Sequence, residues 1–168
     1  NLVGFIQSIF YPFGSGIVVK EIPFQNRGYG FSKKKGLPNS PAPRKRPLHT
    51  LSILVARNDR KDYIIGCAGG DLRPQIHVEV LTGIIDYKRS LSEAVDLPRY
   101  ILIEWRNGKP SQALIEQDLD LLGALPKYMN LVKPKSPATG IVHALKRVNK
   151  GILEFVADYR GGGLALAK

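Results

Sequence analysis

The sequence contains a single cysteine, few acidic residues and no long apolar run. With Cys67 alone, neither an internal disulfide nor a cluster of thiolate metal ligands can form within the chain. No apolar stretch approaches the roughly 18 residues that span a bilayer, so we expect no membrane insertion. The lone cysteine slightly favours a reducing compartment such as the cytoplasm. The sequence begins with Asn1 rather than Met, so we expect that processing or trimming has removed what came before, and the missing signal peptide says nothing about localisation.

The histidines, carboxylates and glycines lack the spacing of a metal or cofactor site. His77 and His143 are too scattered for a zinc site. Glu79 and Glu93 show no pairing of the kind that acid–base catalysis uses. The glycines at 161–163 lack the lysine and the following helix of a phosphate-binding loop. We therefore expect no metal ion and no cofactor.

What the chain does have is a basic excess, with 25 basic residues against 14 acidic ones and a net charge of +11. Two basic triplets, Lys33–Lys35 and Arg44–Arg46, flank a Pro/Gly/Asn-rich stretch and predict an irregular basic loop over residues 33–47. No aromatic residues alternate with them, as a platform for single-stranded nucleic acid would require. A solvated basic surface is favoured, an acidic partner subunit comes second, and nucleic-acid binding is unlikely by comparison.

Hydrophobic periodicity predicts strands, then helices, then strands, which is an α+β pattern within one domain spanning residues 1–168. Ser90 and Glu93 have the spacing of a capping box that begins a short helix ending before Pro98. Strands are expected at 2–10, 17–19, 50–56, 62–67, 100–105, 139–147 and 152–157, and other helices at 72–87 and 112–125. The last two strands are expected to form a hairpin around residues 149–151.

Four segments, in order and with characteristic spacing, resemble the C-terminal small subunit of the γ-glutamyltransferase superfamily, which includes glutathione-cleaving transferases and cephalosporin-type acylases. Weaker similarities lie at 93–94, 98–99 and 157–160. The four segments are Phe13-Gly14-Ser15-Gly16, Gln25-Asn26-Arg27-Gly28 with Phe31, Lys45-Arg46-Pro47-Leu48-His49-Thr50, and Gly66–Asp71 with its Gly-Gly pair.

The resemblance implies the αββα sandwich of the N-terminal-nucleophile hydrolases. A precursor of this kind undergoes autoprocessing, and the newly exposed threonine acts as nucleophile with its own α-amine as base. That threonine is expected upstream of Asn1, which has no hydroxyl or thiol. The chain alone is therefore expected to be inactive, and its implied partner is the large subunit cut from the same precursor.

The resemblance also places parts of a catalytic site in this chain. Gly69 and Gly70 match the pair whose backbone N–H groups form the oxyanion hole, and a helix beginning near Asp71 would add a favourable dipole. Ser8 matches a hydroxyl that supports the nucleophile. The alternative for Gly69 and Gly70 is a tight turn between strand and helix with no catalytic role.

The expected substrate-binding residues are Asn26, Arg27, His49 and Thr50. His49 and Thr50 stand where transferases carry two serines that hold the substrate's α-carboxylate, although a purely structural role for His49 stays open. Arg27 and Gly30 replace the amide and the acidic residue that hold its α-ammonium. An arginine repels an ammonium and binds a carboxylate through two parallel N–H groups.

These departures imply the acylase-like branch, with an acyl group that ends in a carboxylate. The alternative for Arg27 is an ion pair with Asp71 or Glu21. The function expected for the complete protein is hydrolysis of, or acyl transfer from, a small amide or γ-glutamyl substrate. The other hypothesis is a catalytically inactive fragment or scaffold of the same fold, which would self-associate as a homo-oligomer through its exposed apolar surface.

Overall fold

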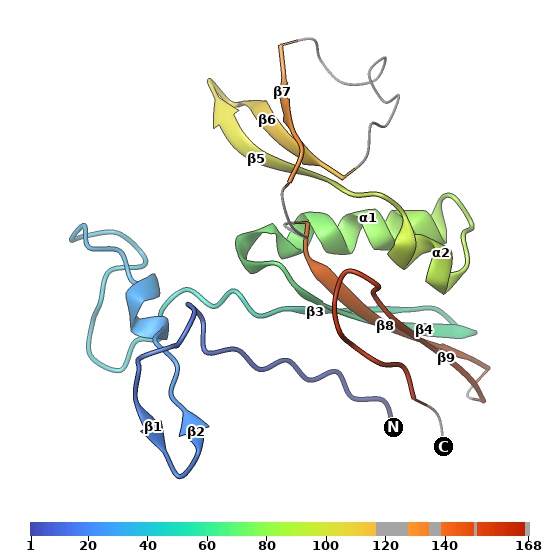
Figure 1. Ribbon diagram of the computed structural model, residues 1–168, viewed down its shortest axis with the longest axis horizontal. Coiled ribbons are helices and arrows are strands. Elements are labelled where there is room, and N and C mark those ends of the chain that lie inside the picture. Colours follow the sequence, from blue (N-terminus) through green and yellow to red (C-terminus); the bar gives the residue numbers. More distant parts are fainter. Residues whose placement is uncertain (117–127, 135–138, 150, 167–168) are drawn as a thin grey trace. The chain divides into compact units, whose positions relative to one another are not determined.

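A computed structural model describes residues 1–116, 128–134, 139–149 and 151–166 (Figure 1). The chain divides into two compact units. The helix–sheet unit comprises Asn1–Phe5 and Ser52–Lys168, and the loop unit comprises Ile6–Leu51. Each unit is described by itself below, and the single domain expected over residues 1–168 stays a prediction.

A four-stranded antiparallel sheet forms the base of the helix–sheet unit. Its strands, in spatial order, are β3 (Ile53–Arg57), β4 (Lys61–Ala68), β8 (Ile141–Val148) and β9 (Ile152–Ala157). Tyr63, Ile65 and Cys67 alternate with less buried neighbours along β4, so one face of the sheet is well buried and the other is more exposed. The four expected strands are confirmed, including the hairpin of β8 and β9.

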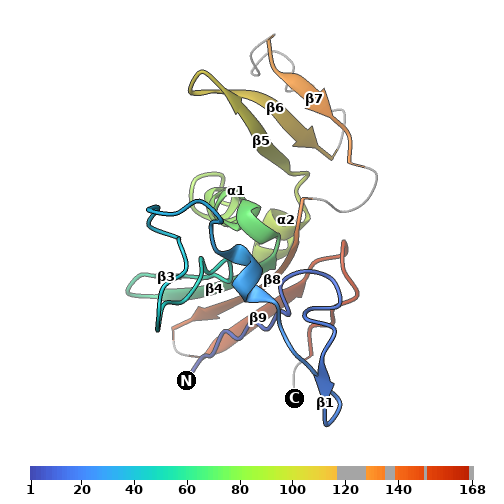
Figure 2. The same ribbon diagram turned by 90° about the vertical axis from the view of Figure 1, so that its left-hand side faces the viewer.

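Two helices cover that face. They are α1 (Arg73–Ile85), which follows the short 3-10 turn η2 (Gly70–Leu72), and α2 (Leu91–Asp96). Figures 1 and 2 show both helices on one side of the four-stranded sheet. Ile76 and Val80 of α1 are almost fully buried in the core with Ile65 of β4.

The ends of the helices follow the sequence pattern. Pro74 stands in the first turn of α1, where its missing N–H costs nothing. The Ser90 hydroxyl accepts a bond from the Glu93 N–H at 3.2 Å, and the Glu93 carboxylate accepts one from the Ser90 N–H at 2.8 Å. The expected capping box is thereby confirmed.

A three-stranded sheet lies on the other side of the helices (Figure 2). It consists of β5 (Tyr100–Arg106), β6 (Lys109–Ile115) and β7 (Asn130–Val132). The helix expected over 112–125 is wrong for its first residues, which belong to β6, and its residues 117–125 lie outside the described ones. The reason is the turn before it: Asn107 (φ 51°) and Gly108 (φ 73°) both adopt the left-handed conformation of a two-residue hairpin.

The strand expected over residues 2–10 is also wrong, because no regular strand is assigned there. Val3 and Phe5 are more than 80% exposed. Gly4 instead lies flat against the sheet, since a Cβ there would be 2.9 Å from side-chain atoms of Ile53 and Ile64. Phe10, at φ 81°, ends the extended path.

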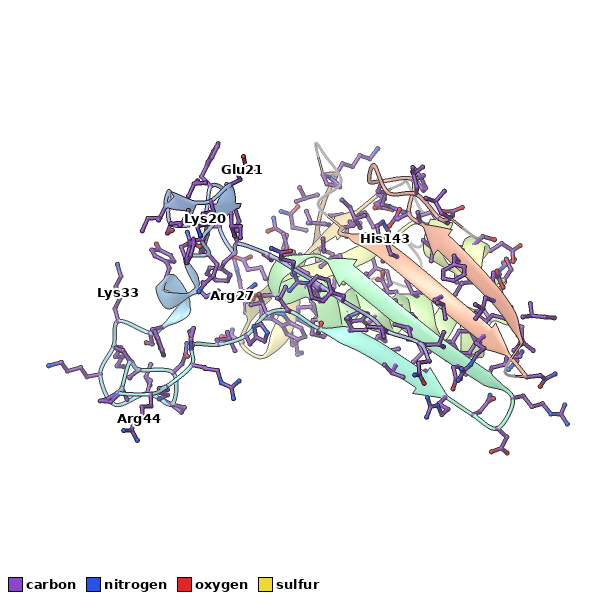
Figure 3. All side chains as sticks on the ribbon, turned by 90° about the horizontal axis from the view of Figure 1, so that it is seen from below. Lys20, Glu21, Arg27, Lys33, Arg44 and His143 are labelled. Atoms are coloured by element: carbon purple, nitrogen blue, oxygen red, sulfur yellow. The ribbon has the colours of Figure 1, made fainter. Side chains whose placement is uncertain are left out.

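The loop unit contains little regular structure. Strands β1 (Val18–Val19) and β2 (Ile22–Pro23) pair across a turn in which Lys20 and Glu21 both have positive φ (Figure 3). The 3-10 turn η1 (Arg27–Gly30) follows. Among the described residues of the whole chain, no helix combines the length and apolarity needed to cross a bilayer.

Candidate active site

The expected oxyanion glycines lie at the end of the central strand β4. Gly70 has φ +54°, a left-handed conformation that favours glycine. Gly69 is extended, but a Cβ there would lie 2.6 Å from Cδ1 of Ile76. The two positions therefore favour glycine for different reasons, one conformational and one steric. We call Ala68–Gly70 the glycine turn.

A third glycine, which the sequence did not reveal, packs against this turn. Gly140 has φ +84°, and a Cβ there would lie 2.5 Å from Cδ1 of Ile76 and 2.7 Å from the Ala68 carbonyl oxygen. Ile76 thus contacts the turn from α1 while Gly140 closes it from the start of β8. No local sequence pattern identifies Gly140, because its partners Ile76 and Ala68 lie 64 and 72 residues away in the chain.

The backbone donors of the glycine turn are available. The Gly69 carbonyl accepts a bond from the Leu72 N–H at 3.0 Å, which begins η2. Among the described residues, no turn or loop hydrogen bond uses the N–H of Gly69 or of Gly70. Two adjacent amides at a helix start, with their donors uncommitted, can stabilise a developing negative charge. The oxyanion hole itself stays a prediction.

Buried polar residues lie next to the glycine turn at the end of β4. Arg73, almost fully buried, donates from Nε to the Cys67 carbonyl at 2.7 Å. Burial raises the pKa of Cys67 to about 11, so its thiol stays protonated. Burial also lowers the pKa of His77, whose Nε2 lies 3.3 Å from the Ser52 hydroxyl. Neither Cys67 nor His77 therefore offers a charged reactive group at neutral pH.

A second buried cluster joins the helices to the sheet. Arg99 and Asp158, each no more than 2% exposed, form an ion pair at 2.7 Å. Arg160 extends it with bonds to Asp158 at 3.0 Å and from Nε to Glu116 at 2.7 Å. Burial alone would raise the pKa of Asp158, but hydrogen bonds from the Arg160 backbone amide and the Arg99 side chain outweigh it, so that pKa is lowered.

For Glu79 on α1, burial outweighs the Tyr100 backbone amide and the Arg99 charge, which favour the ionised form. Both of its carboxylate oxygens are inaccessible to solvent and have no hydrogen-bond partner among the described residues. Burial raises the pKa of Glu79 to about 7. The side chain therefore carries a proton for part of the time at neutral pH.

The loop unit brings the expected substrate-binding residues together. The Arg27 guanidinium lies 3.4 Å from the Thr50 hydroxyl and 5.2 Å from the centre of the Phe10 ring. Its Nη2 is buried and has no hydrogen-bond partner among the described residues. No ion pair joins Arg27 to Glu21 in the described part of the loop unit. Arg27 thus holds an uncommitted donor next to a hydroxyl.

The other expected residues are partly committed within the same unit. Asn26 donates to the Gly14 carbonyl at 2.7 Å and accepts from the Tyr11 N–H at 3.0 Å, so its amide fixes the loop. The Ser8 hydroxyl accepts from the Phe10 N–H at 3.0 Å. His49 is exposed. Their roles toward substrate and nucleophile stay predictions.

Comparison with known proteins gives these features a context. The family model described as gamma-glutamyltranspeptidase matches residues 1–167. The oxamate amidohydrolase proenzyme of Klebsiella pneumoniae is 34% identical over 171 residues, which cover 97% of this chain and 32% of that protein. The glutathione hydrolase-like YwrD proenzyme of Bacillus subtilis is 29% identical over 174 residues, covering 99% and 33%. The chain thus spans about a third of the length of these curated relatives.

Solved structures show the same fold. The γ-glutamyltranspeptidase from Pseudomonas nitroreducens complexed with L-DON aligns with a TM-score of 0.81 at 22% identity, covering all of this chain and 94% of that one. The cephalosporin acylase from Bacillus halodurans aligns with a TM-score of 0.74 at 27% identity, covering 92% and 30%. The chain therefore belongs to the γ-glutamyltranspeptidase family and has the α+β fold of its N-terminal-nucleophile hydrolases.

Proposed function

We propose that this chain is the small-subunit part of an amide-bond hydrolase or acyltransferase, and that it supplies the oxyanion hole and the acyl-binding pocket. The observation that carries the proposal is the glycine turn, where no described residue accepts a hydrogen bond from the N–H of Gly69 or Gly70 at the start of η2. Two such neighbouring donors can both point at one developing negative charge. A single donor of this kind lowers the barrier by about 3 kcal/mol.

The proposed reaction begins upstream of this chain. A threonine hydroxyl preceding Asn1 attacks the amide carbonyl and passes its proton to its own α-amine. Gly69 and Gly70 hold the oxyanion through their N–H groups, and the amine product leaves with that proton. Water or a second amine then releases the acyl group. The Ser8 hydroxyl is assigned to support the nucleophile.

The acyl group is proposed to end in a carboxylate. Arg27 supports this, because its buried Nη2 is uncommitted and the Thr50 hydroxyl lies beside the same guanidinium. Arginine donates to a carboxylate through two parallel N–H groups, and a nearby hydroxyl can complete the contact. One relative is described as an oxamate amidohydrolase, and oxamate is itself an amide that carries a carboxylate.

The proposed partner is a large subunit cut from the same precursor, since both relatives described above are proenzymes. The more exposed face of the four-stranded sheet, which the chain's own N-terminal residues cover in part, suits such a partner. Val55, Leu153 and Phe155 are each at least 40% exposed. Phe155 also lines an open cavity of about 390 Å³ on this face. An apolar face of this kind is normally covered by another layer.

The test uses a precursor extended upstream through the expected threonine. It should cleave itself, as read by mass spectrometry, and hydrolyse an amide of a dicarboxylic acid. The Gly69→Ala variant should lose most of that activity while keeping the large-subunit contact, and the chain beginning at Asn1 should be inactive. A clean failure with both γ-glutamyl and dicarboxylic acyl amides would overturn the proposal.

The second candidate is an inactive scaffold of the same fold, for which the exposed apolar sheet face is the supporting observation. It predicts self-association of the chain through that face. Light scattering tests the scaffold candidate by measuring the oligomeric state. If this candidate is right, Phe155→Glu should convert an oligomer to a monomer without changing any activity of the precursor.

A further inference from the structure

The positive charge of the protein is concentrated in the loop unit. Its 46 residues carry eight lysines and arginines against one acid, Glu21. That is a net charge of +7 out of the +11 of the whole chain. No aspartate or glutamate occurs between Ile22 and Asn58. A basic excess of this density produces a strong positive potential around the unit.

Six of these cations belong to the basic loop, residues 33–47, and all six are exposed. None forms an ion pair with another described residue. In the described part of the chain, the one aromatic ring close to any of the six cations is that of Tyr29, whose centre lies 6.0 Å from the Lys33 Nζ. Lys33 and Arg44 leave opposite edges of the loop in Figure 3. The six charges therefore act through their combined electrostatic field rather than by binding one small ligand group together.

The loop is fixed in place by a single asparagine. The Asn39 side chain donates from Nδ2 to the Gly30 carbonyl at 2.7 Å and accepts from the Leu48 N–H at 3.0 Å. Its own carbonyl accepts from the Ser32 N–H at 2.8 Å. Asn39 thereby joins the two ends of the loop.

Those two ends adjoin the proposed acyl-recognition residues. Gly30 is the last residue of η1, which begins at Arg27. Leu48 stands two residues before Thr50, whose hydroxyl lies 3.4 Å from the Arg27 guanidinium. The Asn39 bonds thus tie the loop to Gly30 and Leu48, which lie three and two residues along the chain from Arg27 and Thr50 in the same compact unit.

We propose that the basic loop attracts acyl donors bearing several carboxylates, namely acidic peptides, toward Arg27. This inference rests on the proposed function and names its substrate class. Fields of this kind raise the association rate of an oppositely charged ligand by about 10-fold or more at low salt. They act within about 8 Å at physiological ionic strength, so the effect requires the loop to be fixed near the site.

An acidic peptide fits these observations better than a nucleic acid does. Residues 32–47 contain no aromatic side chain on which a base could stack. The loop is also bonded to Gly30 and Leu48, which are close in the chain to the residues proposed to bind the acyl carboxylate, and a nucleic-acid surface would not need that placement.

The experiment uses the complete precursor and two acyl donors with the same scissile amide, one with a single carboxylate and one extended by an acidic peptide. The loop variant combines Lys33→Gln, Lys34→Gln and Lys35→Gln. The matched control combines Lys61→Gln, Arg89→Gln and Lys109→Gln, three exposed cations of the helix–sheet unit. Binding of a fluorescent deca-glutamate peptide is measured in parallel, because it needs no catalysis.

The loop variant is expected to lower kcat/KM for the acidic donor about 10-fold at low salt, with kcat unchanged and the loss abolished at high salt. The control variant and the singly charged donor should change less than 2-fold. Equal kinetics and equal peptide binding in the loop and control variants would overturn the inference. So would a loop-dependent affinity for DNA or RNA with unchanged kinetics.

Failure of the proposed function has a different signature. A precursor that hydrolyses neither donor refutes that function. Binding of the deca-glutamate peptide then tests the role of the loop separately. If only the loop variant loses affinity for the peptide, the loop is still an anion-attracting surface. If both variants or neither lose affinity, that role is rejected as well.

Discussion

Arg73 at the start of α1 holds the carbonyl of Cys67 at the end of β4 through a 2.7 Å hydrogen bond from Nε. The bond joins the first turn of a helix to the residue just before the glycine turn. We therefore assign Arg73 as a positioning residue for that turn.

Replacement of Arg73 by Met should leave the buried Cys67 carbonyl without this donor. We expect a loss of about 1–3 kcal/mol in the free energy of unfolding, measured by urea denaturation. In the complete precursor, kcat should fall with little change in KM. Arg73→Lys should recover part of the stability, whereas equal values of kcat for the wild type and Arg73→Met would contradict the assignment.

Gly140→Ala should be costly because φ is +84° and the new Cβ would meet Cδ1 of Ile76 at 2.5 Å. The matched control is Gly108→Ala, at φ +73° with no atom within 4 Å of its Cβ. We expect the control to cost about 1 kcal/mol through backbone strain and Gly140→Ala about 2–3 kcal/mol more. Chemical denaturation measures the free energy of unfolding of both variants. An equal loss in the two would show that the Ile76 side chain moves aside at no energetic cost.

Stability should depend on pH through Glu79, whose pKa rises to about 7 in the folded protein from 4.5 unfolded. The folded state binds the proton more tightly, so the free energy of unfolding should decrease as pH rises from about 4.5 to 7. The loss is on the order of 3 kcal/mol. Glu79→Gln should remove this dependence and be more stable than wild type at pH 8. Asp86→Asn, at an exposed carboxylate, should leave the pH profile unchanged.

The buried pair Arg99–Asp158 should show strong coupling. Asp158→Asn leaves Arg99 with a buried charge facing a neutral group, and about 3–5 kcal/mol should be lost. Arg99→Met together with Asp158→Leu should cost less than Asp158→Asn alone, because no charge is then left unpaired. A double-mutant cycle by thermal unfolding measures the coupling, and additive effects would disagree with the geometry.

The sequence predicted those elements whose pattern is local. Ile76, Val80 and Ile84 recur at helical spacing, and Ser90 with Glu93 marks a helix start, so α1 and α2 were expected correctly. The sheet strands β3, β4, β8 and β9 were found from β-branched runs between turn residues. The glycines at 69 and 70 were found by family resemblance, and the structure adds why each position favours glycine.

The remaining features depend on contacts that no local pattern contains. The run 2–10 is as apolar as a buried strand, but it finds no strand partner among the described residues. Strand β6 was taken for helix because the strict alternation of β4 is absent there. Arg73, Gly140 and Asn39 matter through hydrogen bonds or packing with residues 6 to 72 positions away, and a single sequence cannot reveal such pairs.

Ile76 contacts Gly69 and Gly140 through the same methyl group, Cδ1. A residue of the hydrophobic core is therefore in direct contact with both segments that shape the glycine turn. Under the proposed function, both folding and catalysis constrain this one side chain, so we expect position 76 not to change independently among homologues. Sequences of related proteins should change positions 69, 76 and 140 in concert, with a smaller residue at 76 wherever either glycine is replaced.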